Sequence, residues 1–397
     1  MEMPGPGYAF FGPEERANVE EVLDHWERTR HTYGRPEPAS FVHRFEALAG
    51  EVFGARHAVT TNSGTSALLT ALVAAGIGAG DEVIVPGYTF VASIASVAHL
   101  GAVPVLAEID ESLTLDPADV ERRITPRTRA VMAVHMLGAP CDLTALRRVT
   151  ERHGLLLVED VAQACGGTYE GRALGTFGGL GAFSLNPYKV LTSGDGGFVL
   201  TDDPGLHRRA AAFKDHGRYP ADGPAGDPLF GLNLRMPELS AAVACAQLAK
   251  LDSVLRRTRA VKRRLAAAIP AREGVRRRTL HDAAGECGTL LVHLFDRAGD
   301  ARAVASALGT TTLRDSGQHY YGNMRQLTAP GGRYAGPALR PGALPRTDDC
   351  LARAVALSVG VSDRHLGAGF GTTVHASDTE IDWVAERFTK AVRGVLG

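Results

Sequence analysis

The sequence predicts an α/β fold in which a large domain with a mainly parallel sheet between helices is followed by a smaller α+β domain. From about residue 55 to 205, short continuous apolar runs alternate with stretches of helical spacing, a pattern typical of parallel sheets covered by helices. A long helical run follows, and after it the elements become shorter. The chain has 397 residues, 45% of them hydrophobic, which is enough for about two to three domain-sized units. We place the boundary at residue 250, between domains of residues 1–250 and 251–397.

Four apolar runs without polar alternation predict strands that are buried on both faces. They are Val83–Val85, Val103–Leu106, Ala130–His135 and Leu155–Val158. Leucines and alanines at helical spacing predict a helix over Ser66–Ala75. Strands that alternate with helices in this way are typical of a parallel sheet.

Three further helices are predicted from apolar periodicity and from their end signals. An amphipathic stretch over Thr144–His153 precedes Gly154, and a longer helical run extends over Pro237–Ile269. The last helix is expected over Asp378–Leu396, with Ser377 as its N-cap. These helices account for the outer layers of the two domains.

One uncharged stretch, Val83 to Ala107, is 25 residues long and could in principle cross a bilayer. Pro86, Gly87 and Pro104 interrupt it, and its apolar pieces are short. We therefore expect a strand, a loop, a helix and a strand inside a core, and no membrane span. The N-terminus has neither the basic region nor the apolar region of a signal peptide.

Charge and cysteine content exclude several classes of protein. Lys and Arg number 43 against 44 Asp and Glu, so the basic excess of a nucleic-acid binder is missing. The five cysteines are scattered and form no C-x-x-C pair, which argues against a disulfide framework and against a metal site. Reduced thiols and a cytoplasmic location are expected.

A basic cluster lies in residues 250–278, where eleven Lys and Arg face only two acids. It has two interpretations: a solvated helix face, or a charged rim that attracts a phosphorylated substrate. Before it, glycines, alanines and prolines in Pro220–Phe230 predict a loop.

Candidate site residues follow the predicted strands, because ligands of open α/β sheets bind at the carboxyl ends of the strands. The segment Asn62–Thr65 opens the helix over Ser66–Ala75 with hydroxyls and a glycine, Gly64. Free N–H groups at such a helix start suit a phosphate, although ordinary N-capping by Ser63 or Thr65 would explain the same residues.

Two acids and a glutamine lie at the end of another strand. Glu159 and Asp160 follow the run Leu155–Val158, and Gln163 comes three residues later. A carboxylate at the end of an apolar strand needs a cationic or hydrogen-bonding partner. A cap on the following turn is the alternative.

Lysine is rare in this chain, with five lysines against 38 arginines, so Lys189 in an apolar loop is informative. Partial desolvation would lower the pKa of its amine from about 10.4 and make it a nucleophile for carbonyls. A surface lysine whose stem packs on the loop is the alternative.

Tyr88 and Phe90 follow a strand and offer an aromatic platform for a flat ring, unless they are core aromatics.

Together these residues offer a phosphate cradle, an aromatic platform, a carboxylate for a pyridinium nitrogen and a nucleophilic lysine. Pyridoxal 5′-phosphate (PLP) requires these four contributions from a protein. No other cofactor is indicated, since the chain has neither a P-loop nor an H-E-x-x-H motif.

The order and wording of these motifs resemble a known family. The chain is similar to the DegT/DnrJ/StrS aminotransferases, the sugar aminotransferase branch of the fold-type-I PLP enzymes, closely over about residues 40–260. This resemblance implies a seven-stranded sheet in the large domain. It rests on Asn-Ser-Gly-Thr-Ser-Ala-Leu at 62–68, Gly-Asp-Glu-Val-Ile-Val-Pro at 80–86, Thr-Phe-Val-Ala-Ser at 89–93, Glu-Asp-Val-Ala-Gln-Ala at 159–164, and Phe-Ser at 183–184 with Lys189 five residues on.

The resemblance also implies roles for single residues. Lys189 is similar to the lysine that forms a Schiff base with PLP and later shuttles a proton. Asp160 resembles the partner of the pyridine nitrogen, and Gln163 the partner of the phenolic oxygen. The other implied cofactor contacts are Gly64, Thr65 and Ser184 at the phosphate, Phe90 on the ring, and Asn233 at the phosphate of a neighbouring subunit.

A contribution of Asn233 to a neighbouring subunit implies a homodimer with shared active sites. Substrate contacts are implied for Tyr88, His319 and Tyr320, because Gly317–Tyr321 falls where relatives place such residues. A packing role for His319 is the alternative.

The resemblance implies transfer of an amino group from glutamate or glutamine to a keto sugar, nucleotide-linked, in amino-sugar or secondary-metabolite biosynthesis. Some relatives that remove a sugar hydroxyl have histidine at the position of Lys189, so the lysine favours transamination. A keto cyclitol or a ketosugar acid as the substrate and a PLP-binding regulator without turnover remain alternatives. Neither nucleic acid nor a membrane is an expected partner.

Overall fold

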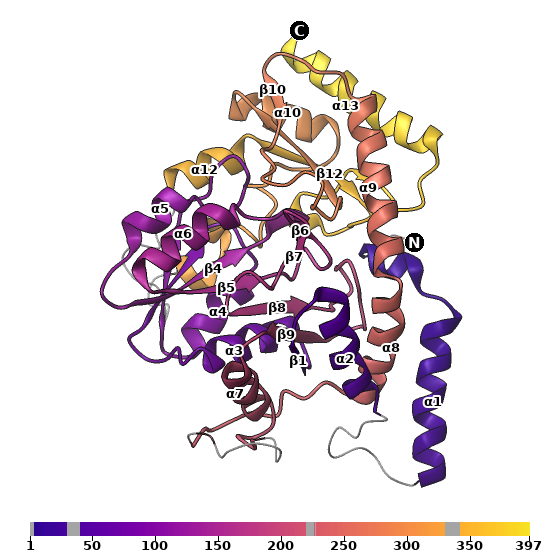
Figure 1. The fold of residues 1–397 in the computed structure, drawn as a ribbon. Helices are drawn as coiled ribbons and strands as arrows, with labels where there is room; N and C mark the ends of the chain where they lie inside the picture. The colour runs from indigo at the N-terminus through magenta and orange to yellow at the C-terminus, as the bar shows by residue number, and fades with distance from the viewer. Residues whose placement is uncertain (1–3, 30–39, 220–225, 227, 330–341) are drawn as a thin grey trace.

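The computed structural model describes residues 4–29, 40–219, 226, 228–329 and 342–397. Its largest element is a seven-stranded sheet in the order β1-β9-β8-β5-β4-β2-β3 (Figure 1). Its strands in that order are His57–Thr61, Gly197–Thr201, Leu180–Ser184, Leu156–Asp160, Thr128–Val134, Glu82–Pro86 and Val103–Ala107. Only β9 runs antiparallel to its neighbours, so the mainly parallel sheet is confirmed.

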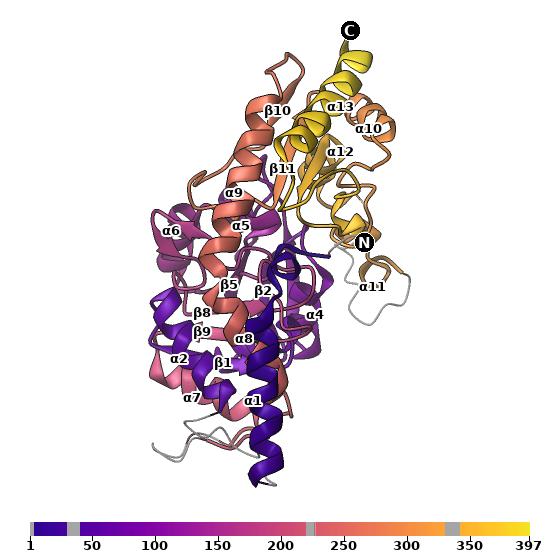
Figure 2. The same ribbon diagram turned by 90° about the vertical axis from the view of Figure 1, so that its right-hand side faces the viewer.

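Helices cover both faces of this sheet, and its central strands are buried on both sides. In β2, Val83 and Val85 belong to one core cluster and Ile84 belongs to the other. Figure 2 shows α4 and α6 on opposite sides of the strands. The helices of this part of the chain are α1 Pro13–Thr29, α2 Phe41–Phe53, α3 Gly64–Ala74, α4 Val91–His99, α5 Pro117–Arg123, α6 Leu143–His153, α7 Pro204–Lys214 and α8 Glu238–Ala249.

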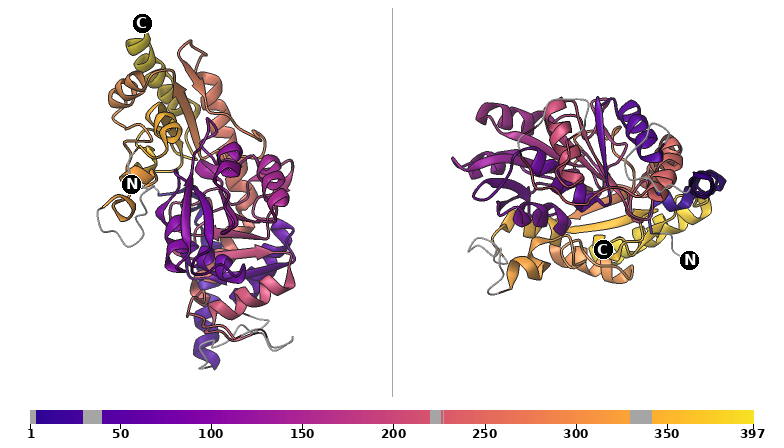
Figure 3. Two further views of the ribbon diagram at one scale, coloured as in Figure 1. Left: turned by 90° about the vertical axis from the view of Figure 1, so that its left-hand side faces the viewer. Right: turned by 90° about the horizontal axis from the view of Figure 1, so that it is seen from below.

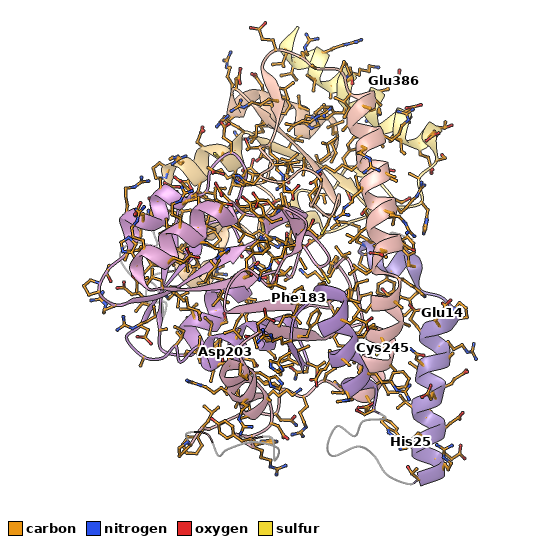
Figure 4. The ribbon with its side chains drawn as sticks, viewed as in Figure 1. Glu14, His25, Phe183, Asp203, Cys245 and Glu386 are labelled. Atoms are coloured by element: carbon orange, nitrogen blue, oxygen red, sulfur yellow. The ribbon has the colours of Figure 1, made fainter. Side chains whose placement is uncertain are left out.

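Local signals explain where several of these elements begin and end. Gly54 and Gly154 terminate α2 and α6 with positive φ values of 67° and 62°, which glycine adopts without steric cost. Asp203 caps α7 by accepting hydrogen bonds from two backbone N–H groups (Figure 4). In the interior, Phe183 of β8 stacks on Phe198 of β9 with ring centroids 4.3 Å apart.

A smaller α+β domain follows, as predicted, and packs against the large sheet's domain (Figures 1 and 3). Its sheet has the order β10-β11-β12-β13. In β11, Leu290, Val292 and Leu294 face the core shared with the large domain, whereas Leu291 and Phe295 face an outer core. The strands are Val275–Arg277, Leu290–Phe295, Ala354–Val359 and Gly371–Thr372, and the helices are α9 Leu251–Ala268, α10 Ala298–Ala307, α11 Arg325–Thr328, α12 Pro345–Ala352 and α13 Asp378–Leu396.

The remaining elements are short. They are the ribbon β6–β7 (Thr168–Tyr169 and Arg172–Ala173) and the 3-10 turns Pro6–Phe10, Met136–Gly138, Tyr321–Asn323 and Arg364–Leu366. The predicted helix over 237–269 is interrupted at Lys250, which separates α8 from α9. A domain boundary at residue 250 stays a prediction.

The uncharged stretch Val83 to Ala107 forms β2, α4 and β3, so its predicted division is confirmed. Across the described parts of the chain, no helix is both long and apolar enough to cross a membrane. The capping box at Ser377 confirms the predicted start of α13. The loop expected over Pro220–Phe230 lies mostly outside the described residues.

The basic cluster is neither an entirely solvated face nor a free charged rim. Lys250 pairs with Glu15 of α1 at 2.7 Å, and Lys262 is 7% exposed and pairs with Glu286. Arg257 donates to the carbonyls of the segment before α13. These cations join elements that are distant in sequence. Neither a solvated helix face nor a free charged rim therefore describes the whole cluster.

Candidate active site

A pocket of about 350 Å³ opens at the carboxyl ends of β2, β4, β5 and β8 and is closed on one side by residues of the small domain. Eight of the predicted site residues line it: Gly64, Thr65, Phe90, Asp160, Gln163, Ser184, Lys189 and His319. They come from five separate stretches of the chain. The residues that were predicted from the strand ends thus meet in one pocket of the fold.

The N-terminus of α3 forms one wall of this pocket. Ser63 caps the helix by accepting from the N–H of Ser66 at 3.1 Å. Within the described chain, the N–H groups of Gly64 and Thr65 have no acceptor. A Cβ at Gly64 would lie 2.5 Å from the Cβ of Ser184, so only glycine lets the helix start approach that hydroxyl. Two free N–H groups and a hydroxyl fit a phosphate.

Lys189 enters the pocket from the loop that follows β8. Its Nζ has no hydrogen-bond or ion-pair partner among the residues that the structure describes. Burial lowers the pKa of the amine, while Asp160 and Asp363 act in the opposite direction. The amine is therefore neutral at a lower pH than an ordinary lysine, which makes it a nucleophile.

We expect Asp363→Asn to lower the pKa of Lys189 further, because this carboxylate favours the charged amine. Reductive methylation of Lys189 in cofactor-free protein, followed by mass spectrometry across pH, measures the midpoint. Asp195→Asn is the matched control, since Asp195 lines the same pocket but has no part in the shift. A midpoint that rises in Asp363→Asn, or that falls equally in the control, contradicts this electrostatic account.

Asp160 ends β5 and is 5% exposed. Its Oδ2 accepts a hydrogen bond from Ser93 Oγ at 2.7 Å, and its Oδ1 accepts from the N–H of Ala162 at 3.1 Å. The hydroxyls of Thr89 and Ser93 lie 2.6 Å apart and extend this network. An ionised carboxylate has about four acceptor positions, so Asp160 keeps capacity for a protonated ring nitrogen in the pocket.

The neighbouring acid has a different task. Glu159 is fully buried and accepts hydrogen bonds from the N–H groups of Gly175, Phe177 and Gly178 at 2.7–2.8 Å. Successive strand residues point to opposite faces, which separates Glu159 from Asp160. Glu159 therefore holds the loop that contains Gly175, Phe177 and Gly178, whereas Asp160 lines the pocket.

Gln163 is oriented by a strained turn. Its Oε1 accepts from the N–H of Leu137 at 2.9 Å, which leaves the Nε2 donors for the pocket. Leu137 has a φ of 59°, a left-handed conformation that costs a non-glycine residue about 1–3 kcal/mol. Arg278 of the small domain is buried and donates to the carbonyls of Met136 and Leu137 at 3.2 Å each. A small-domain arginine thus holds the turn that orients Gln163.

Arg278→Met should loosen this turn, because two buried carbonyls lose a charged donor worth about 1.5–3 kcal/mol per hydrogen bond. We expect faster hydrogen exchange at the amide of Leu137, measured by mass spectrometry of the peptide that contains it. Arg277→Met is the control, because Arg277 is exposed and, among the described residues, its side chain bonds only the carbonyl of Ala266. Equal exchange in the two variants would show that Arg278 does not hold the turn.

His319 lines the pocket from the small domain. Its Nδ1 donates to the carbonyl of His365 at 3.1 Å, and its ring lies 5.4 Å from that of Phe90. Burial and the nearby Lys189 lower the pKa of His319 to about 3, so the ring is neutral. Its Nε2 is then an acceptor.

Three predicted site residues do not line this pocket. Tyr88 is fully buried, and its hydroxyl has no partner in the described part of the chain. Tyr320 is 4% exposed and donates to Asp348 at 2.7 Å. These two tyrosines face each other in an isolated β-bridge, so their placement favours packing over substrate contact. Asn233 is exposed and lies opposite Asp215, away from the pocket of its own chain.

Several pocket residues were not identified from the sequence. Asp363 and His365 follow the apolar run of β12 (Ala354–Val359), a strand-end signal that was not used, and Gln318 precedes His319. Their position depends on the packing of the small domain on the large one, which no local pattern reveals. Asn186, Tyr188 and Asp195 lie in the loops around Lys189, a region in which the sequence drew attention to the lysine alone.

The sheet order, the second domain and the pocket define an α/β transferase fold of the PLP-dependent fold-type-I class. The model of the DegT/DnrJ/EryC1/StrS aminotransferase family matches residues 13–363. The chain belongs to this family.

Named relatives support this membership. An L-glutamine:2-deoxy-scyllo-inosose aminotransferase of Micromonospora echinospora is 48% identical over 231 residues, 56% of this chain and 55% of that protein. The chain thus spans about half the length of such curated relatives. A dTDP-3-amino-3,4,6-trideoxy-alpha-D-glucose transaminase of Streptomyces venezuelae is 38% identical over 80% of this chain and 81% of its own. The crystal structure of S. venezuelae DesV with a ketimine intermediate matches 98% of both chains, with a TM-score of 0.78 and 33% identity.

Proposed function

We propose that this protein is a PLP-dependent aminotransferase that transfers an amino group from glutamate or glutamine to a nucleotide-linked keto sugar. The observation that carries the proposal is the amine of Lys189, which has no partner among the described residues, has a pKa lowered by burial, and shares one pocket with Asp160 and the start of α3. The family and the named relatives support the same reaction class.

The residues present fit PLP in size and in chemistry. The free N–H groups of Gly64 and Thr65 and the Ser184 hydroxyl would hold the phosphate. Asp160 would pair with the ring nitrogen, Gln163 would donate to the phenolic oxygen, and the ring of Phe90 would cover the ring of the cofactor. When bound, PLP supplies an aldehyde that condenses with amines and a ring that accepts electrons.

The protein's own side chains would have separate roles in the reaction. Lys189 would bind the aldehyde carbon, release it to the donor amine, and move a proton at its Nζ between donor and cofactor carbons. Asp160 would keep a proton on the ring nitrogen through its negative charge. The neutral ring of His319 and the side chain of Gln318 would contact the ketone from the small domain.

The experiment that completes this proposal identifies the ketone that accepts the amino group. The relative at 48% identity is named for 2-deoxy-scyllo-inosose, which favours a keto cyclitol as a second candidate. Steady-state amination of a dTDP-linked 3-keto sugar, of 2-deoxy-scyllo-inosose and of a ketosugar acid, with glutamine as donor, separates these classes by kcat/KM. We expect the nucleotide-linked sugar to be preferred. Preference for the inosose assigns the cyclitol, and no amination of any ketone assigns a regulator without turnover.

Five free cysteines support a reducing compartment, and we propose a cytoplasmic enzyme. We also propose a homodimer in which Asn233 contacts the phosphate of the partner's cofactor. Its exposed position outside the pocket of its own chain supports this role.

Asn233→Ala should weaken PLP retention, and mixing it with Lys189→Ala should restore activity. A hybrid dimer contains one chain of each variant. One of its two sites then carries both substitutions, and the other site carries neither. With half of the dimers hybrid, the mixture should reach about a quarter of the wild-type rate. Turnover measured after refolding the two chains together checks this, with refolded single variants as controls. At equal total protein concentration, a mixture with no more than half the activity of Asn233→Ala alone excludes action across the interface.

A further inference from the structure

A second pocket, of about 490 Å³, lies in the small domain among the end of α9, β10, β11 and α13. None of its lining residues contributes to the candidate active site. These elements form the end of the molecule that lies farthest from α7 in Figure 1. The proposed reaction does not use this pocket.

The floor of this second pocket is apolar and buried. Ile269 of the α9 end, and Phe388 and Val392 of α13, are between 1% and 8% exposed. They belong to the outer core of the small domain. A pocket of this size with an apolar floor fits a single small molecule.

A buried polar atom interrupts the apolar floor. His293 of β11 is 4% exposed and lies between Leu291 and Phe295, two core residues on the same face of the strand. Its Nδ1 has no hydrogen-bond partner among the residues that the structure describes, and its ring centroid lies 4.4 Å from that of Phe388. A buried polar atom without a partner costs about 1–3 kcal/mol, so an apolar residue would suit the free protein better.

The rim carries four arginines, Arg272, Arg276, Arg277 and Arg393, and no acid lines the pocket. Arg276 is paired with Glu111 and Asp296, so its charge is largely neutralised. Arg277 donates to the backbone carbonyl of Ala266, which leaves its charge uncompensated, and Arg272 donates to an oxygen of Gly397, the last residue of the sequence. The backbone carbonyl of Arg393 accepts from the N–H of Gly397, but its guanidinium has no ion-pair or hydrogen-bond partner in the described parts of the chain. The rim therefore has a net positive charge.

We propose that this second pocket binds a small amphipathic anion, with an apolar body on the Phe388 floor and an oxyanion at Arg393. His293 would hydrogen-bond a polar atom of the ligand. Arginine holds carboxylate and phosphate groups through two parallel hydrogen bonds, so either group is accommodated. Burial, with Arg277 and Lys262 nearby, lowers the pKa of His293 to about 3, so the ring acts as a neutral hydrogen-bonding group.

The test is a fluorescence titration of the PLP-loaded enzyme with 8-anilinonaphthalene-1-sulfonate, an aromatic oxyanion. We expect saturable binding of one probe per chain. Thr389→Trp, which fills the pocket, and Arg393→Glu should each weaken binding by at least about tenfold. Arg387→Glu is the matched control on α13, because Arg387 covers Trp383 and does not line the pocket; its affinity should stay within about twofold of wild type.

Competition distinguishes the two oxyanions. Stronger displacement by 1-naphthyl phosphate assigns a phosphate ligand, and stronger displacement by 1-naphthoate assigns a carboxylate. Uncharged naphthalene should displace the probe poorly. Equal displacement by naphthalene, or equal probe affinity in Arg393→Glu and Arg387→Glu, overturns the anion site.

His293→Leu separates a ligand-binding role from a packing role. Removing the unpaired nitrogen should raise the Tm of the probe-free enzyme and weaken probe binding. A lower Tm with unchanged probe affinity would show that His293 is a packing residue. All of these measurements are independent of transaminase activity, so failure of the proposed function would leave their outcome unaffected.

Discussion

Replacing Lys189 with alanine is expected to abolish amino transfer while the protein remains folded. The side chain has no partner among the described residues, so its removal breaks no hydrogen bond or ion pair. The remaining pocket groups, the α3 start, Ser184 and Asp160, should still bind PLP without a covalent link. We expect turnover to fall by about 10⁴-fold or more, because both the nucleophile and the proton carrier are lost.

The measurement combines glutamine-dependent turnover with PLP retention after gel filtration. Lys390→Ala, at an exposed lysine of α13, is the control and should behave as wild type. Added methylamine should restore part of the activity of Lys189→Ala, since a free amine can replace the missing group. Substantial activity of Lys189→Ala without an added amine would disprove the assignment.

The second large effect is expected from Asp160→Asn. Asparagine keeps the size of the side chain but loses the charge that would hold a proton on the ring nitrogen. We expect kcat to fall by about 10²–10⁴-fold with the melting temperature nearly unchanged. The pKa of Lys189 should also fall, because Asp160 favours its charged form.

Ser93→Ala is the matched comparison for Asp160→Asn. It removes the hydrogen bond to Asp160 Oδ2 but keeps the carboxylate charge. If charge is what matters, Ser93→Ala should lose far less turnover than Asp160→Asn. Near-wild-type turnover in Asp160→Asn would remove its proposed role, and equal losses in both variants would assign the effect to orientation.

The sequence predicted the large domain well because its signals are local. Continuous apolar runs identified β2, β3, β4 and β5, and the polar residues after them identified most of the pocket. Asp160 and Gly64 were identified because the end of a strand and the start of a helix can be recognised from a few neighbouring residues. The same holds for Ser377, whose capping box lies within four residues.

Contacts between distant parts of the chain were not predictable in this way. In the sequence, Arg278 is one basic residue of a cluster. In the structure, its side chain donates to the carbonyl of Leu137, 141 residues earlier, and holds that turn. Lys262 was expected on a solvated helix face or on a charged rim, but Glu286 pairs with it in the interior. Tyr88 and Tyr320 have the residue type of a substrate contact, and only their burial against each other favours a packing role.

The visible spectrum of the purified protein, recorded with PLP before and after glutamine or glutamate is added, tests the central assignment most directly. A yellow absorption band that depends on Lys189 and bleaches when the donor is added is the expected result. It would demonstrate the covalent lysine link and the first half of amino transfer in one experiment. No band in the presence of added PLP would contradict the proposed site and the proposed function together.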